Sequence, residues 1–205
     1  KYIDLNLDRI LILLKKLGNP HKKLPPTIHI AGTNGKGSTV SFLRHVLEFN
    51  GLNVHTYTSP HLVHFSERIR LCGKLISKKN LEEVLLEVEQ VNNGQEITFF
   101  EITTAAAFIV FSRIRADILL LEVGLGGRLD ATNVIENPLA SIITSISYDH
   151  ENFLGNTLKQ IAFEKAGIIK KNIPVITQNQ HNDVIEVFSK ASKKLNAPLY
   201  IIGDN

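Results

Sequence analysis

Hydrophobic and polar residues follow two different periods along this chain, and the two periods predict helices and strands in alternation. From Ile3 to Leu17 apolar residues recur every three or four positions, so we expect an amphipathic helix that Gly18 and Pro20 end. Later ranges that predict helices are 39–49, 80–91, 99–113, 158–169 and 184–195. Short apolar runs that predict buried strands are 27–30, 53–57, 117–121, 139–146, 175–177 and 199–202.

This alternation of helices and buried strands predicts the fold class. Strands joined through helices pair in parallel, so we expect an α/β fold with a mostly parallel sheet and helices on both faces. The range 68–76 is predicted to be extended with a turn at Gly73, and Ser77 is predicted to cap the next helix. A chain of 205 residues is long enough to form a full core, which indicates one domain.

Composition and charge exclude several classes of protein. No run of 18 apolar residues could span a membrane, and 23 basic against 20 acidic residues give a net charge of only +3, with basic pairs scattered along the chain. We therefore expect no membrane and no nucleic-acid partner. A single cysteine, Cys72, and the lack of a signal peptide indicate a cytoplasmic protein. A start at Lys1 and the absence of methionine indicate part of a longer gene product.

The strongest local signal is the glycine-rich stretch from Gly32 to Thr39, between a predicted strand and a predicted helix. Backbone N–H groups of such a loop can surround phosphate oxygens, while Lys36 reaches the outer phosphates and the Ser38 hydroxyl binds Mg²⁺. The pattern departs from the usual one, since the first glycine of the common pattern is missing and Gly37 separates Lys36 from Ser38. A simple glycine turn before a helix is the alternative, but the context favours a P-loop NTPase-like sheet that binds nucleotide.

A second signal is Glu122, which ends the apolar run 118–121 and runs into the glycine-rich loop 124–133. A carboxylate in this place reaches the Mg²⁺ beside the phosphates in nucleotide-binding sheets. The three glycines of the loop let its backbone approach a ligand, and Arg128 and Asp130 add both signs of charge. Leu129 breaks the dinucleotide G-x-G-x-x-G pattern, which argues against a dehydrogenase.

Two further residues are candidates for chemistry. His150 follows the predicted strand 139–146, at the sheet edge where ligands gather; an exposed or structural histidine is the alternative. Lys165 shares an apolar stripe with Ile161 and Ala162 on a predicted helix. Its ammonium either reaches water past the apolar stem or is desolvated, with a lowered pKa that makes it reactive.

These motifs together resemble the folylpolyglutamate synthase and dihydrofolate synthase family, within the Mur ligase superfamily of ATP-dependent amide-bond synthetases. The matching stretches, in family order, are 32–38, 58–62, 99–101, 121–133, 149–150 and 164–169. The loop Leu-Gly-Gly-Arg-Leu-Asp-Ala-Thr-Asn at 125–133 favours the folate branch over the peptidoglycan relatives. The resemblance implies a sheet like that of the Mur ligase central domain, with residues 1–205 as the ATP- and pterin-binding domain and the glutamate-binding C-terminal domain absent from this chain.

The resemblance also implies roles for individual residues. The cofactors are ATP and Mg²⁺. Residues that match ATP-phosphate positions are Thr33, Asn34, Gly35, Lys36, Gly37 and Ser38. Those that match Mg²⁺ positions are Ser59, Glu122 and His150, with Ser38 added from the phosphate-loop pattern. Lys165 matches a lysine carbamylated by CO₂, so Lys36, His150 and Lys165 form the expected catalytic set. Residues near the pterin substrate are Thr98, Phe100, Leu129, Asp130 and Ala131. The charges expected around phosphates and metals are Lys36, Glu122, Arg128, Asp130, His150 and Lys165.

The implied reaction joins L-glutamate to the carboxylate of dihydropteroate or a reduced folate through an acyl phosphate, catalysed by a monomer. Alternatives from other classes are a truncated MgATP-binding module without turnover, another Mur-type amide ligase, or a P-loop kinase unrelated to folate. The sequence does not separate dihydrofolate synthase from folylpolyglutamate synthase activity.

Overall fold

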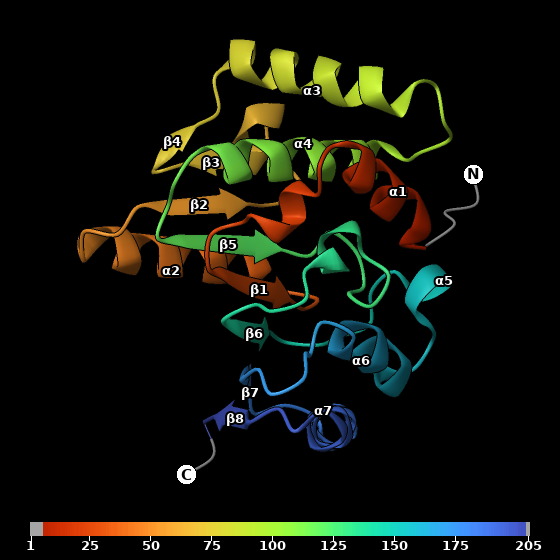
Figure 1. Ribbon diagram of the computed structural model, residues 1–205. Coiled ribbons are helices and arrows are strands. Elements are labelled where there is room, and N and C mark those ends of the chain that lie inside the picture. The colour runs from red at the N-terminus through yellow and green to blue at the C-terminus, as the bar shows by residue number, and fades with distance from the viewer. Residues whose placement is uncertain (1–5, 204–205) are drawn as a thin grey trace.

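The computed structural model describes residues 6–203, and its centre is one eight-stranded sheet with the strand order β4-β3-β2-β5-β1-β6-β7-β8 (Figure 1). The strands are β1 (Thr27–Ala31), β2 (Val54–Tyr57), β3 (Ile69–Leu71), β4 (Lys74–Leu75), β5 (Ile118–Glu122), β6 (Ala140–Ile143), β7 (Val175–Gln178) and β8 (Leu199–Ile202). The strands from β2 to β8 in this order pair in parallel, while β3 and β4 add an antiparallel hairpin at one edge. The predicted α/β class with a mostly parallel sheet is confirmed.

Helices cover both faces of this sheet, as predicted. The longer helices are α1 (Asp8–Lys16), α2 (Lys36–Phe49), α3 (Lys78–Asn92), α4 (Phe99–Arg113), α6 (Leu158–Ala166) and α7 (Asn182–Leu195), and a short α5 spans Glu151–Leu154. Alternate residues of β5 divide the core: Leu119 and Leu121 belong to the cluster with α1, α3 and α4, whereas Leu120 lies against Val40 of α2. A further cluster lies where α6 and α7 pack on β6 and β7.

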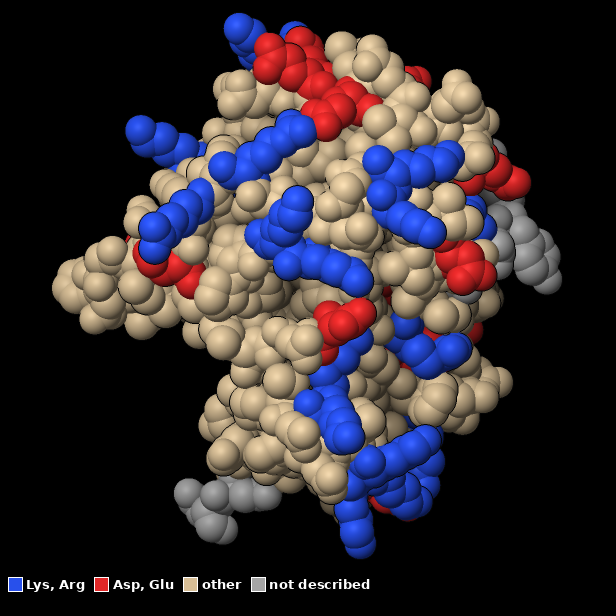
Figure 2. Space-filling view, viewed as in Figure 1, with Lys and Arg blue, Asp and Glu red and all other residues tan. Residues whose placement is uncertain are grey.

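The helix α4 is apolar all round because it is enclosed. Figure 1 shows α3 as the outermost layer above α4, which itself lies over the sheet, and α1 packs on α4 as well. Both faces of α4 are therefore buried, and the run 103–111 has no exposed side. No helix within residues 6–203 is both long and apolar enough to cross a membrane. Lys and Arg side chains lie interspersed with acidic ones on the face in Figure 2.

Several element ends differ from the predicted ones for local reasons. The part of the first helix predicted from Ile3 lies outside the described residues. The helix α2 begins three residues earlier than expected because Gly35, with φ 86°, forms its N-cap directly before Lys36. The helix α6 ends at Ala166 rather than 169, with Gly167 as its C-cap. The strand β6 ends at Ile143 instead of 146, and α5 was not predicted.

Other predicted details are confirmed. The Ser77 side chain accepts a hydrogen bond from the Asn80 backbone N–H and caps α3. The range 68–76, predicted to be extended, forms the β3–β4 hairpin from Ile69 onward, whereas Arg68 ends a 3-10 segment; the hairpin turn contains Cys72 and Gly73 in left-handed conformations. The carboxyl ends of the parallel strands β1, β2, β5 and β6 meet at one edge of the sheet, so the loops that follow them come together there.

Candidate active site

The loop after β1 is fixed in place by contacts with the residues that follow β6. Gly32 has φ 147°, and a Cβ at this position would lie 1.8 Å from the Thr144 hydroxyl oxygen, so only glycine fits. The backbone N–H groups of Thr33 and Asn34 both donate to the Ser145 carbonyl, at 2.9 and 3.4 Å. The loop therefore has a fixed path before the chain enters α2.

A cavity of about 610 Å³ lies over the N-terminus of α2. Its walls include the predicted phosphate-loop residues Thr33, Asn34, Gly35, Lys36 and Gly37. No side chain caps this helix end, so its first N–H groups remain available to an anion. Lys36 Nζ donates to the carbonyls of Gly32 and Thr33, at 3.0 and 3.3 Å. Ser38 is exposed and is not among the residues that line the cavity, so its proposed contact with metal stays a prediction.

Glu122 and Ser59 come from separate motifs and meet at this cavity. Glu122 ends β5 and is 3% exposed, and one of its carboxylate oxygens accepts a hydrogen bond from the Ser59 backbone N–H at 3.3 Å. Burial raises the pKa of Glu122 to about 7, while the nearby Lys36 ammonium and this hydrogen bond act in the opposite direction. A bound cation would relieve the cost of ionising this buried carboxylate.

The oxygen atoms of Glu122 and Ser59 therefore fit a hard divalent cation, whereas the other predicted ligand, His150, gives less support. The carboxylate of Glu122 is an oxygen ligand of the kind that Mg²⁺ prefers, and Ser59, whose hydroxyl is another such oxygen, lies beside it. His150 is not among the residues that line this cavity; its side chain is 55% exposed, and its one ion-pair partner within residues 6–203 is Asp149, 3.6 Å away. In the same described range no group of three or more His, Cys, Asp and Glu residues is arranged to hold a metal. His150 follows β6 as predicted, but the strand ends at Ile143, seven residues before the histidine instead of four.

Lys165 is buried rather than directed to water. It is 4% exposed, and Nζ donates to the Gly32 carbonyl at 3.0 Å. Burial, reinforced by the nearby Lys36 ammonium, lowers the pKa of Lys165 to about 8; Asp149 and Asp130 act against this shift. The alternative in which the ammonium reaches solvent is therefore wrong, and the side chain is desolvated, as the other alternative requires.

A second, apolar cavity of about 440 Å³ adjoins the first. The five residues predicted to lie near a pterin, which are Thr98, Phe100, Leu129, Asp130 and Ala131, all line it. The first turn of α4 is fixed by a capping box, in which the Thr98 hydroxyl accepts from the Glu101 N–H and the Glu101 carboxylate accepts from the Thr98 N–H. Phe100 lies so close to Gly124 that a Cβ there would stand 2.4 Å from the Phe100 ring.

Asp130 organises the loop on the wall of this apolar cavity. Its carboxylate accepts hydrogen bonds from the backbone N–H groups of Gly124, Leu125 and Thr132, and from the Thr132 hydroxyl. Burial raises the pKa of Asp130, although these hydrogen bonds favour its ionised form. His29 Nε2 lies 2.9 Å from the Thr132 hydroxyl oxygen. Because that hydroxyl already donates to Asp130, His29 donates to it and is neutral, with its pKa lowered to about 3 by burial.

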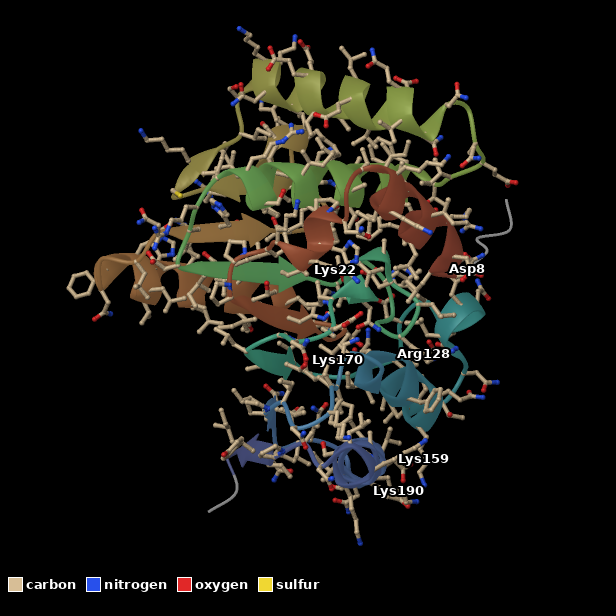
Figure 3. All side chains as sticks on the ribbon, in the orientation of Figure 1. Asp8, Lys22, Arg128, Lys159, Lys170 and Lys190 are labelled. Atoms are coloured by element: carbon tan, nitrogen blue, oxygen red, sulfur yellow. The ribbon has the colours of Figure 1, made fainter. Side chains whose placement is uncertain are left out.

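Arg128 and two loop glycines serve internal packing. Arg128 pairs with Glu164 of α6 at 2.9 Å, and its guanidinium lies 5.7 Å from the centre of the Phe163 ring, as its place beside α6 in Figure 3 indicates. The expectation that Arg128 faces the phosphates is therefore wrong. A Cβ at Gly127 would lie 2.8 Å from the Glu164 carbonyl, and one at Gly124 would strike Phe100. These contacts require glycine at positions 124 and 127 whether or not a ligand binds.

The sequence motifs missed several residues that line the two cavities. The apolar cavity also includes Asn6, Arg9 and Arg68, and the phosphate-loop cavity includes Arg44 and Arg70. None of these residues belongs to a recurring motif or to a glycine-rich loop, so spacing alone carried no signal for them. Ser59 and Pro60 line both cavities and form their common wall.

Comparison with known proteins agrees with the α/β sheet described above. The family profile of the Mur ligase middle domain matches residues 30–205. The chain belongs to this family of α/β domains. Within it, the chain belongs to the folylpolyglutamate synthase and dihydrofolate synthase family.

The similar proteins cover almost all of this chain. The dihydrofolate synthase/folylpolyglutamate synthase of Bacillus subtilis is 43% identical over 206 residues, which is 97% of this chain and 47% of the relative. An FPGS–AMPPCP–folate complex superposes with a TM-score of 0.91 at 38% identity, over 98% of this chain and 51% of the other. Escherichia coli FolC in complex with DHPP and ADP superposes with a TM-score of 0.90 at 35% identity, over 98% of this chain and 48% of the other. The chain thus spans about half the length of the relatives it matches.

Proposed function

We propose that the gene product containing this chain is an ATP-dependent ligase that joins L-glutamate to the carboxylate of dihydropteroate, of reduced folates, or of both. The observation that carries this proposal is the common wall of Ser59 and Pro60 between the phosphate-loop cavity and the apolar cavity. An acid bound in one cavity can thereby meet a phosphate bound in the other. The similar proteins bound to AMPPCP and folate, or to DHPP and ADP, support this pairing of ligands.

The proposed reaction has two steps. A carboxylate oxygen of the pterin substrate attacks the γ-phosphorus of ATP, and ADP leaves, which gives an acyl phosphate. The amino group of glutamate then attacks the acyl carbon, phosphate leaves, and the nitrogen loses a proton as the amide forms. Lys36 and the N–H groups of α2 stabilise negative charge on the transferring phosphoryl group, and the loop 33–38 positions it.

Mg²⁺ is proposed to bind at Glu122 and Ser59, with His150 and Ser38 as the further ligands that the resemblance and the loop pattern suggest. The ion would neutralise phosphate charge. Glu122 and Ser59 already lie together at the cavity, which supports their assignment more strongly than that of His150. We propose that Thr98, Phe100, Leu129, Asp130 and Ala131 bind the pterin.

Lys165 is proposed to carry a carbamate. The reaction requires the neutral amine, which adds to the carbon of CO₂ and loses one proton. Burial and the lowered pKa of Lys165 support this assignment, because they increase the neutral fraction near neutral pH. We expect a carbamate carbon signal in NMR spectra after incubation with ¹³C-labelled bicarbonate, and we expect Lys165→Ala to lack both the signal and the activity. Normal activity of this variant at any bicarbonate concentration would contradict the assignment.

The whole reaction is tested by incubating the intact gene product with MgATP, L-glutamate and either dihydropteroate or a reduced folate. We expect ADP and a glutamylated pterin, and no product when the pterin is left out. Product without a pterin would show another Mur-type amide ligase instead. ATP hydrolysis or phosphorylation that does not depend on the pterin or glutamate would indicate an unrelated kinase or NTPase.

A MgATP-binding module without turnover is the second candidate for the 205-residue chain by itself. The observation that favours it is the chain's coverage of only about half of its relatives. We expect the isolated chain to bind nucleotide without forming product, while the intact gene product turns over. We also propose a cytoplasmic monomer, which size-exclusion chromatography and fractionation of cells test directly.

A further inference from the structure

Two arginines line the apolar cavity, and they differ in their partners. Arg9 on α1 pairs with the carboxylate of Glu101 at 3.3 Å. Arg68 belongs to the 3-10 segment Phe65–Arg68, and its Nε donates to Nδ1 of His61 at 2.9 Å. The Arg68 guanidinium also lies 5.3 Å from the centre of the Phe65 ring. Both of these partners are uncharged, since His61 accepts through Nδ1 and is therefore neutral in this arrangement.

The carboxylates near this cavity are already engaged elsewhere. Glu67, the neighbour of Arg68 in the chain, accepts hydrogen bonds from the backbone N–H groups of residues 62, 63 and 64, which hold the pKa of its carboxyl below the usual value. Asp130 accepts four hydrogen bonds from its own loop. Within residues 6–203, no carboxylate forms an ion pair with Arg68, and its two terminal nitrogens have no hydrogen-bond partner.

Arg68 lies next to the wall between the two cavities. Its backbone carbonyl accepts a hydrogen bond from the Thr58 N–H at 3.0 Å, and the chain continues from Thr58 into Ser59 and Pro60. Arg68, Ser59 and Pro60 line the apolar cavity together. Arg68 is thus half-buried beside the wall that a reacting carboxylate has to reach.

His61 and Phe65 fix the stem and one edge of the guanidinium, so its two terminal nitrogens can donate to a ligand. A guanidinium presents its donors in a planar fork that matches the two oxygens of a carboxylate. We propose that Arg68 binds a carboxylate of the acid substrate in the apolar cavity and thereby selects the acid over neutral pterins. This inference rests on the proposed function, because it assumes that a pterin acid occupies that cavity.

The test compares one charged and one neutral ligand in the intact gene product. Pteroate and its primary amide differ only in the group that Arg68 is proposed to bind. Calorimetric titration of wild type, Arg68→Gln and Arg68→Lys with both ligands separates the loss of carboxylate recognition from a general loss of the cavity. Arg113→Gln is the matched control, since Arg113 pairs with Glu87 on the distant surface formed by α3 and α4.

We expect wild type and Arg113→Gln to bind pteroate more tightly than the amide. Arg68→Gln is expected to weaken pteroate binding by about 10- to 100-fold, the range for hydrogen bonds to charged groups, and to leave amide binding within about twofold. Arg68→Lys keeps the charge but loses the fork, so an intermediate loss is expected. Circular dichroism and thermal unfolding check that each variant is folded.

Two results would overturn the inference. If Arg68→Gln weakens both ligands equally, Arg68 packs the cavity wall and does not recognise the carboxylate. If it changes neither affinity, Arg68 has no role in binding. Should Arg68→Gln fail to fold, unchanged discrimination in a folded Arg68→Lys would lead to the same rejection. Failure of both ligands to bind wild type is a different outcome, because it refutes the pterin assignment of the proposed function.

Discussion

Lys36 and Lys165 donate to the same oxygen atom, the carbonyl of Gly32, each at a distance of 3.0 Å. The two residues are far apart in the sequence, on α2 and α6, and the path of the Gly32 loop brings their ammonium groups together. Two cations at one carbonyl repel each other, and Lys36 adds to the effect of burial in lowering the pKa of Lys165. The phosphate loop and the buried lysine therefore form one electrostatic unit.

Replacement of Lys36 by alanine tests the phosphate-binding half of this unit. We expect Lys36→Ala to reduce ATP turnover by about 100- to 1000-fold, because charge on the transferring phosphoryl group loses a positioned cation. The fold should persist, since the Lys36 side chain donates only to loop carbonyls. ADP release and circular dichroism measure the two effects. Lys79→Ala is the control because Lys79 is an exposed surface residue, and turnover retained in Lys36→Ala would refute the role.

The pH dependence of stability tests the state of Lys165. Its pKa is about 8 in the folded protein, against the ordinary lysine value of 10.5 that applies to the unfolded chain. Below pH 8 the folded protein bears the full cost of a buried ammonium, and this cost disappears as the pH rises to 10.5. We expect the unfolding free energy of wild type to rise relative to that of Lys165→Met across that interval. A constant difference in urea titrations over the same interval would mean that Lys165 titrates normally.

Much of the fold follows from local patterns in the sequence. The apolar runs predicted each strand of the parallel sheet, and the range 99–113 predicted the helix α4. Glu122 and Ser59 were predicted from separate motifs. They lie together because parallel strands place their carboxyl ends at one edge. Lys165 was found because its helical stripe includes a charge among apolar residues.

Other features of the site depend on contacts that no local pattern encodes. Arg128 faces Glu164, 36 residues later, because the loop 124–133 lies against α6, and the sequence does not give the path of that loop. Arg68 reaches the apolar cavity from a short 3-10 segment beside an edge hairpin, where no period repeats. His150 is separated from β6 by an irregular stretch, because that strand ends earlier than its apolar pattern suggests.

Glu122 predicts a pH dependence of stability that is opposite in sign to the one predicted for Lys165. Its pKa rises from 4.5 to about 7 on folding, so the folded protein bears the cost of the buried anion above pH 7 and none below 4.5. Without metal, wild type should therefore lose stability relative to Glu122→Gln as the pH rises from 4.5 to 7. Thermal unfolding of both proteins in metal-free buffer measures this, and parallel curves would contradict the raised pKa.

Added Mg²⁺ should counteract that loss, since a cation favours the ionised carboxylate. We expect Mg²⁺ with a non-hydrolysable ATP analogue to raise the melting temperature of wild type above pH 7, and the effect should fade as the pH drops through 7. Glu122→Gln should show a smaller effect without this pH dependence. Glu87→Gln, on the exposed face of α3, is the control and should behave like wild type.

Gly124 allows Phe100 to lie against the loop that follows β5, and a single methyl group tests this contact. A Cβ at residue 124 would stand 2.4 Å from the Phe100 ring, so in Gly124→Ala the ring has to move, which changes the wall of the apolar cavity. We expect pteroate binding to weaken by more than about tenfold while AMPPCP binding remains within about twofold. Calorimetry measures both affinities. The double variant Gly124→Ala/Phe100→Leu removes the clash and should recover part of the loss; no recovery would assign the effect to the loop backbone instead.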